Sequence, residues 1–174
     1  MRLLRYLFLC CLSIAPLAKA DSITLAGDQL QWLLPVGGLL MAYSDEDTQA
    51  STQAWKSYGA TLVSVHSLKL LINKKRPDGS NDNSFPSGHT AGAFMGAAFL
   101  DRRYGHAIGV PAYALAAFTG FSRVHARKHD AIDVVAGAGI AIASSYYFVS
   151  ETDNLMIIPI ISQNSFSITG QLRF

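Results

Sequence analysis

The sequence predicts an all-α protein: a helical bundle of about five helices that follows a signal peptide and ends in a small C-terminal β-hairpin. Half of the 174 residues are hydrophobic and only 15% are charged, which is apolar for a soluble protein. Long apolar segments alternate with short polar breaks, a pattern typical of packed helices. The last segment instead alternates apolar and polar residues with a period of two. A chain of this length forms one domain with a substantial core.

The first 20 residues, MRLLRYLFLCCLSIAPLAKA, have the pattern of a signal peptide. Two arginines precede an apolar run over residues 6–18, and Ala18-Lys19-Ala20 forms a small-x-small cleavage site. We therefore expect export to the periplasm. An uncleaved anchor helix is the alternative, although the run is short for a bilayer span. Both cysteines, Cys10 and Cys11, lie in this segment, so the cleaved protein would contain no disulfide and no cysteine metal site.

Five helices and a terminal extension are expected after the signal peptide. The polar breaks SDEDTQAS, PDGSNDNS and DRRYGH each separate two of the helices. The predicted helices span residues 28–43, 50–74, 87–101, 106–121 and 130–149. Residues 21–150 thus form a helical domain.

The extension, residues 151–174, is predicted to be a β-hairpin. An apolar run precedes a polar turn, after which Phe166, Ile168, Leu172 and Phe174 follow a period of two. Two strands do not form an independent domain. We therefore expect the hairpin to pack on the bundle or on a second copy of the chain, which would make a homo-oligomer.

The charges of the chain argue against nucleic acid as a partner and leave two local basic clusters. Loss of the signal peptide leaves 11 basic and 12 acidic residues, so no overall positive field remains. Most of these cations flank the stretch Pro86-Ser87-Gly88-His89. They are Lys69, Lys74, Lys75 and Arg76 before it and Arg123, Arg127 and Lys128 after it.

The stretch between the two clusters combines a helix start with a histidine. Pro86 interrupts any preceding helix, Ser87 is a good N-cap, and Gly88 allows the backbone to bend. These residues explain a helix start but leave His89 unexplained. His89 falls in the first turn of the helix, where free N–H groups and the helix dipole favour a bound anion.

Lys69 and Arg76 are seven residues apart, so we expect both on one face of the second helix, which Pro77 ends. A solvated charged face is the usual explanation of such a pair. Lys69 lies within the apolar run 68–72, however, and an unpaired cation in apolar surroundings is costly. This setting argues against a solvated face.

His129 and Asp133 are four residues apart at the start of an apolar segment. On a helix they would share a face, and the carboxylate could hold the second nitrogen of the imidazole. A nucleophilic or basic histidine needs such a partner. The alternative is a metal site, because His125, His129 and Asp133 could lie on one helical face. The surrounding lysines and arginines argue against a metal, since cations repel it.

These segments together resemble the signature of the type 2 phosphatidic acid phosphatase family. The matching segments are Lys69-x6-Arg76-Pro77, Pro86-Ser87-Gly88-His89 and Ser122-Arg123-x5-His129-x3-Asp133. The superfamily also contains bacterial non-specific acid phosphatases and vanadium haloperoxidases. Every signature position is filled in the expected order, whereas the short chain and the terminal hairpin are not features that the family leads us to expect.

The resemblance implies hydrolysis of a phosphomonoester or a pyrophosphate through a phosphohistidine, with no metal and no cofactor. By this resemblance His129 is the nucleophile, Asp133 fixes its tautomer, and His89 donates a proton to the leaving oxygen. The implied phosphate-binding residues are Lys69, Arg76, Ser87, Gly88 and Arg123. Substrates would be phosphorylated lipids or small phosphate esters.

The function and the location of the protein stay open at this point. An exported anion-binding or structural module without catalysis would keep the cations of the site, and a haloperoxidase would share its pocket. Two positioned histidines favour the phosphatase, because phosphate binding alone needs only the cations. We expect a periplasmic protein, soluble or membrane-associated; the alternative is an integral inner-membrane protein whose active site faces the periplasm.

Overall fold

The computed structural model describes residues 21–44, 48–151, 155–162 and 165–172. The predicted signal peptide, residues 1–20, lies outside this part of the chain. The helices are α1 (Ser22–Ser44), α2 (Thr48–Leu71), α3 (Gly88–Tyr104), α4 (His106–His125) and α5 (Ala131–Phe148). The predicted all-α fold is therefore confirmed, with one helix for each predicted segment.

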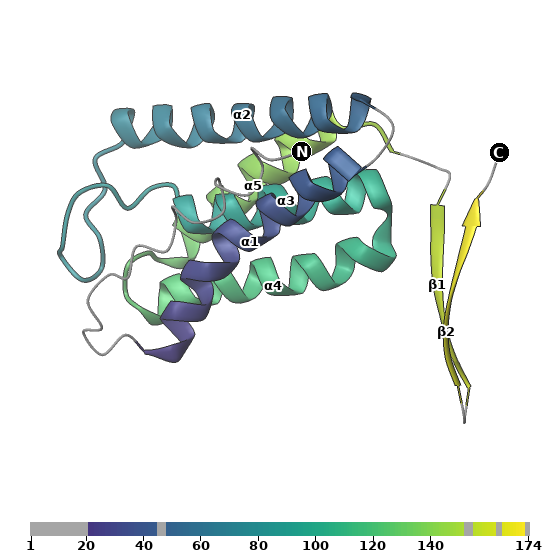
Figure 1. Cartoon of the computed structure of the whole chain (residues 1–174). Coiled ribbons are helices and arrows are strands. Elements are labelled where there is room, and N and C mark those ends of the chain that lie inside the picture. The colour runs from purple at the N-terminus through teal and green to yellow at the C-terminus, as the bar shows by residue number, and fades with distance from the viewer. Residues whose placement is uncertain (1–20, 45–47, 152–154, 163–164, 173–174) are drawn as a thin grey trace, which may run out of the picture.

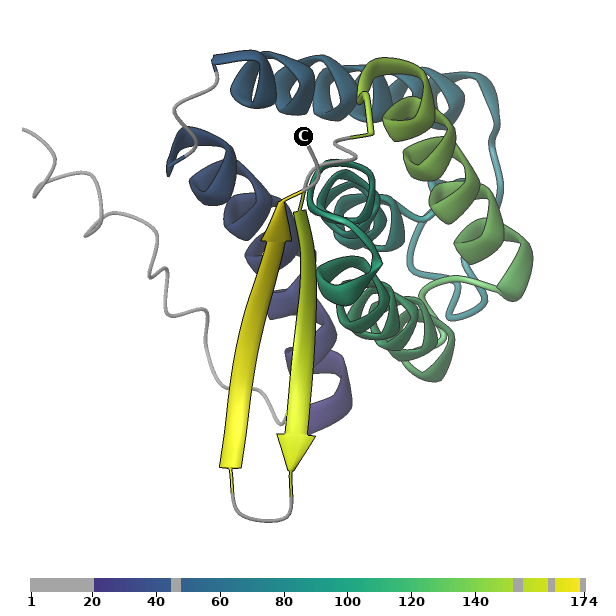
Figure 2. The same cartoon turned by 90° about the vertical axis from the view of Figure 1, so that its right-hand side faces the viewer.

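Helix α3 lies at the centre of the bundle and packs against the other four helices (Figures 1 and 2). Its sequence is rich in alanine and glycine, and most of its residues are buried. Small side chains let neighbouring helices approach closely. A Cβ at Gly96, for example, would lie 2.4 Å from the backbone nitrogen of Pro35 in α1.

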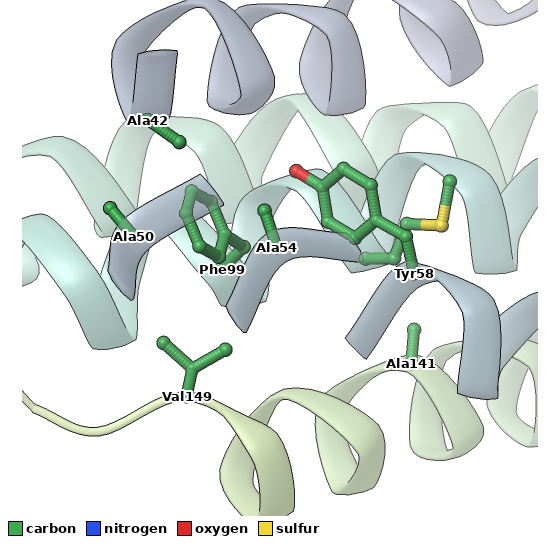
Figure 3. Close-up of a cluster of buried hydrophobic side chains, with 8 residues drawn as sticks. Ala42, Ala50, Ala54, Tyr58, Phe99, Ala141 and Val149 are labelled. Atoms are coloured by element: carbon green, nitrogen blue, oxygen red, sulfur yellow. The ribbon is translucent and has the colours of Figure 1, made fainter. Parts of the chain in front are cut away.

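The larger core side chains gather where α1, α2, α3 and α5 meet (Figure 3). The rings of Tyr58 and Phe99 are 5.8 Å apart in an edge-to-face arrangement. The Tyr58 hydroxyl donates a hydrogen bond to the Pro35 carbonyl at 3.3 Å, which satisfies a buried polar group. The residues packed around these rings are Ala42, Ala50, Ala54, Met95, Ala141 and Val149.

The outer surface of the bundle is unusually apolar. Large exposed side chains occur on α1, α2, α4 and α5 and include Trp32, Leu40, Val63, Val110 and Val135. The interior, in contrast, holds small hydroxyl side chains, namely Ser57, Thr61, Thr90, Thr119, Ser122 and Ser145. Among the described helices, α4 and α5 are long and apolar enough to cross a membrane. Large apolar groups outside and small or polar groups inside are typical of helices packed in a bilayer.

Helix α2 ends earlier than predicted. It stops at Leu71, so the expectation that Lys69 and Arg76 share a helical face, with the helix ending at Pro77, is wrong. Arg76 belongs to the connection of residues 72–87, hereafter the 72–87 connection. Leu70 and Leu71 are 85% and 79% exposed, so the apolar neighbours of Lys69 in the sequence do not bury it.

The terminal strands β1 (Leu155–Ser162) and β2 (Ser165–Leu172) pair antiparallel, with Leu155 opposite Leu172 and Ser162 opposite Ser165. They extend from the end of the bundle that lies opposite the 72–87 connection (Figure 1). Packing of this hairpin on a second copy of the chain stays a prediction.

Candidate active site

The predicted site residues gather at one end of the bundle, where the 72–87 connection meets α3 and the turn between α4 and α5 (Figure 1). Lys69 lies in the last turn of α2 and Arg123 in the last turn of α4. The remaining residues are Arg76 in the connection, Ser87, Gly88 and His89 at the start of α3, His129 in the 126–130 turn, and Asp133 in the first turn of α5.

The 126–130 turn folds back over the end of α4 and so positions His129. Arg127 has a positive φ of 54°, and the His129 N–H donates to the Arg123 carbonyl at 3.3 Å. Lys128 Nζ donates to Asp78 Oδ2 at 2.6 Å, and the Asp78 N–H donates to the Arg127 carbonyl at 3.0 Å. These bonds fix the turn to the 72–87 connection.

His129 and Asp133 form the predicted pair. His129 is buried, Asp133 is fully buried, and His129 Nδ1 lies 3.5 Å from Asp133 Oδ2. His129 precedes α5, whose N-cap is Asp130, so the two residues meet across a helix start and not along one helical face. His125 is the last residue of α4 and pairs with Asp21. The three-residue metal face that the spacing allowed is therefore wrong.

The Asp133 carboxylate is bound more tightly by other residues than by His129. Lys74 Nζ donates to its Oδ1 at 2.7 Å, and the Ser84 hydroxyl donates to its Oδ2 at 2.5 Å. The Asp130 N–H donates to Oδ2 at 3.2 Å, which completes a capping box. Lys74 Nζ also lies 2.6 Å from Asp130 Oδ2. A buried carboxylate needs such partners, because an unpaired buried charge is strongly unfavourable.

The start of α3 is held against α5. Ser87 is the N-cap, and its buried side chain accepts a hydrogen bond from the Thr90 hydroxyl at 2.9 Å. The Ser87 N–H donates to the Asp133 carbonyl at 2.9 Å. A Cβ at Gly137 would lie 2.5 Å from the Ser87 carbonyl oxygen, so only glycine permits this approach. The predicted anion site at Ser87, Gly88 and His89 thus rests directly on α5.

Arg123 is anchored on α1, which the sequence did not suggest. Its Nη1 lies 2.6 Å from Asp28 Oδ1, its Nη2 donates to the Thr24 carbonyl at 2.9 Å, and its Nε donates to Ser122 Oγ at 3.1 Å. Asp28 Oδ1 also lies 3.0 Å from His89 Nε2. One carboxylate therefore links a predicted phosphate-binding residue to the predicted proton donor.

Lys69 and Arg76 are the other two predicted phosphate-binding cations. Lys69 Nζ donates to the Asn83 carbonyl at 2.9 Å, and a side chain at Gly88 would contact Lys69 Cε. Arg76 is half-buried, and within the described residues its buried Nε has no hydrogen-bond partner. The positive charge of Arg76 lowers the pKa of both His129 and His89.

The surroundings of His129 favour its neutral form. Burial lowers its pKa to about 4, and the positive charges of Arg76 and Lys69 act in the same direction, whereas Asp133 opposes them. A neutral imidazole keeps a lone pair for attack. This cluster can therefore bind an anion and present a nucleophilic nitrogen to it.

Three residues that contact the site were missed by sequence reasoning. Asp28 lies on α1, far from the signature in the chain. Lys74 was counted only as part of a basic cluster, and Ser84 only as part of a polar loop. Within the described residues, no group of three His, Cys, Asp or Glu side chains is close enough to hold a metal ion.

Comparison with known proteins identifies relatives of this chain. The family model of the PAP2 superfamily matches residues 42–156. The lipid A 1-phosphatase of Porphyromonas gingivalis is 38% identical over 112 aligned residues, which cover 55% of this chain and 25% of that protein. The lipid A 4'-phosphatase of Helicobacter pylori is 39% identical over 92 residues, which cover 52% of this chain and 46% of that protein. The chain thus matches a quarter and about half of the length of these relatives.

Two solved structures share the fold. The crystal structure of Aquifex aeolicus LpxE aligns with a TM-score of 0.62 at 24% identity, over 75% of this chain and 87% of that one. The transmembrane PAP2 type phosphatidylglycerolphosphate phosphatase from Bacillus subtilis aligns with a TM-score of 0.56 at 24% identity, over 73% of this chain and 71% of that one.

Proposed function

Because this chain belongs to the PAP2 superfamily, we propose that it is a phosphatase that hydrolyses a phosphorylated lipid through a phosphohistidine at His129. The observation that carries the proposal is the buried His129–Asp133 pair, with the positive charges of Arg76 and Lys69 acting on the imidazole. Phosphate binding alone requires the cations but not a neutral histidine oriented by a carboxylate.

In the proposed first step, the Nε2 lone pair of His129 attacks phosphorus. The bond from phosphorus to the leaving oxygen breaks, and His89 gives its proton to that oxygen. Nδ1 faces Asp133, which holds the tautomer and stabilises the positive charge that develops on the ring. In the second step, His89 takes a proton from water as the water attacks phosphorus. The N–P bond then breaks, its electron pair returns to Nε2, and phosphate leaves.

The phosphoryl oxygens would be bound by Lys69, Arg76 and Arg123, together with Ser87 and the backbone N–H of Gly88. Phosphoryl transfer depends mainly on fixed positive groups around these oxygens. The three cations and the N-terminus of α3 supply that charge without a metal ion. In the described part of the chain the Nε of Arg76 has no hydrogen-bond partner, and a phosphoryl oxygen would satisfy this donor.

Two observations support a lipid as the substrate. The curated relatives are phosphatases of lipid A, and the large apolar side chains on the outside of the bundle would suit a lipid environment. We therefore propose an integral membrane protein with its active site at one membrane surface. Export to the periplasm through residues 1–20 is part of this proposal.

The test is phosphate release by the purified full chain in detergent, from a lipid phosphate and from an aryl phosphate, in excess EDTA and with or without vanadate. Vanadate can adopt the geometry of a transferring phosphoryl group and should inhibit. His129→Ala should abolish activity, whereas His66→Ala, an exposed histidine on α2, should not. Activity that needs a metal, or that survives in His129→Ala, would refute the mechanism. Phosphate binding without hydrolysis would instead indicate a binding module.

A further inference from the structure

Two side chains of the 72–87 connection bind the same carboxylate from opposite sides. Lys74 donates to Oδ1 of Asp133 at 2.7 Å, and Ser84 donates to Oδ2 at 2.5 Å. The backbone holds these two residues together, because the Ser84 N–H donates to the Lys74 carbonyl at 2.9 Å. We call this arrangement of Lys74, Ser84 and Asp133 the carboxylate clamp.

We propose that Lys74 is a positioning residue that, through the carboxylate clamp, keeps the neighbouring imidazole of His129 neutral and correctly oriented. The inference rests on the proposed function, because it assigns Lys74 a role in activating the nucleophile. Lys74 reaches the substrate in no step of that mechanism and acts only through Asp133.

The distances within the clamp support a role of Lys74 in orienting His129. The Oδ2 atom of Asp133 lies 3.5 Å from His129 Nδ1, longer than either bond of the clamp. The position of the carboxylate is thus set by Lys74 and Ser84. Within the described residues His129 Nδ1 has no hydrogen-bond partner, so the fixed carboxylate is the acceptor that this nitrogen would reach as the ring aligns. Preorganisation of this kind keeps a reacting nitrogen in its productive position.

The charges around His129 support a role of Lys74 in controlling the protonation of its imidazole. The charged groups that act on His129 are Arg76 and Lys69 from the side of α2, and Asp133 from α5. Among these charges only the carboxylate favours the imidazolium, and a hydrogen bond with the Ser84 backbone acts in the same direction. Lys74 forms ion pairs with Asp133 and with Asp130, and its hydrogen bond lowers the pKa of Asp130. If Lys74 were neutral, it would no longer offset the negative charge of Asp133. The carboxylate would then stabilise the imidazolium of His129 more strongly and raise the pKa of His129.

The adjacent residue offers a matched control. Lys75 carries the same charge one position further along the connection, but its side chain is exposed. A general effect of losing a positive charge would appear when either lysine is replaced by glutamine. An effect of the clamp would appear only at Lys74.

The experiment measures the titration of His129 directly in the full chain in detergent. The chain has five histidines, and NMR of the labelled histidine side chains resolves their titrations, with His129→Gln assigning the signal of interest. In Lys74→Gln we expect the pKa of His129 to rise by about one unit. Lys74→Arg, which keeps the charge, should restore most of the original value, and Lys75→Gln should leave it unchanged.

The pH dependence of kcat/KM gives the second readout. The acid limb of this profile should move to higher pH in Lys74→Gln, by the same amount as the pKa of His129, and should not move in Lys75→Gln. An unchanged His129 titration in folded Lys74→Gln would overturn the inference. If Lys74→Gln does not fold, Ser84→Ala removes the other hydrogen bond of the clamp without changing a charge. This variant should also raise the pKa of His129, and an unchanged pKa would again overturn the inference. If the titration moves but the wild-type chain releases no phosphate, the clamp stands and the proposed function fails.

Discussion

Asp28 Oδ1 lies 2.6 Å from Arg123 Nη1 and so joins the first helix of the bundle to the fourth. The same oxygen lies 3.0 Å from His89 Nε2. Asp28 precedes the region that the family model matches, residues 42–156, yet it contacts two residues of the candidate site. The first helix therefore contributes to the site as well as to the fold.

Asp28→Asn should lower kcat/KM by roughly 10- to 100-fold, the effect expected from loss of a charged hydrogen bond. Asparagine preserves the size of the side chain but cannot form an ion pair with Arg123 or act as a charged acceptor for His89. Steady-state kinetics on the lipid phosphate would measure the loss. Asp82→Asn, in the exposed part of the 72–87 connection, is the control and should retain full activity. Equal activity of the two variants would contradict the role of Asp28.

Two glycines of α1 should respond in opposite ways to alanine. A Cβ at Gly27 would lie 1.9 Å from Ser122 Oγ, beside the Arg123 anchor, whereas a Cβ at Gly37 would meet nothing within 4 Å. Gly27→Ala should therefore destabilise the protein by about 1–3 kcal/mol and reduce activity. Gly37→Ala should stabilise it by about 0.5–1 kcal/mol, because alanine restricts the unfolded chain. Thermal unfolding in detergent distinguishes these outcomes, and similar shifts in both variants would argue against a close approach of α1 to α4.

Activity should persist well into the acid range. Burial lowers the pKa of His129 to about 4, so the imidazole stays neutral, and nucleophilic, down to that pH. Protonation below pH 4 removes the lone pair, and kcat/KM should fall there. An alkaline limb should follow when His89 loses the proton that it donates, giving a bell-shaped profile. A profile that is flat between pH 4 and pH 9 would be inconsistent with two histidines in these roles.

The apolar exterior predicts how the protein partitions in cells. Exposed side chains such as Trp32, Leu40 and Val135 would be costly in water but stable in lipid. The chain should therefore remain in the membrane fraction after an alkaline carbonate wash and be released by detergent. A small peripheral protein and a known integral protein serve as controls. Release by carbonate would indicate a peripheral or soluble protein.

The sequence predicted the parts of this molecule that local patterns determine. Polar breaks separated the helices, although α1 begins at Ser22 and not at residue 28. Ser87 and Gly88 marked the start of α3 where the structure has it. The end of α2 was missed because no glycine or proline follows Leu71 in the chain until Pro77. The contacts of Asp28 and Lys74 could not be predicted, since Asp28 meets Arg123 and Lys74 meets Asp133 only after distant helices pack together.

The contacts that build the site span most of the chain: the Arg123–Asp28 bond joins residues 95 positions apart and the Lys74–Asp133 bond joins residues 59 positions apart. Closing such long loops requires most of the bundle to be assembled first. During synthesis, α5 is the last helix to emerge, and Asp133 emerges with it. A nascent chain therefore acquires the proposed phosphoryl-binding end only when the last helix docks, so the proposed hydrolysis would begin only in molecules whose bundle is complete.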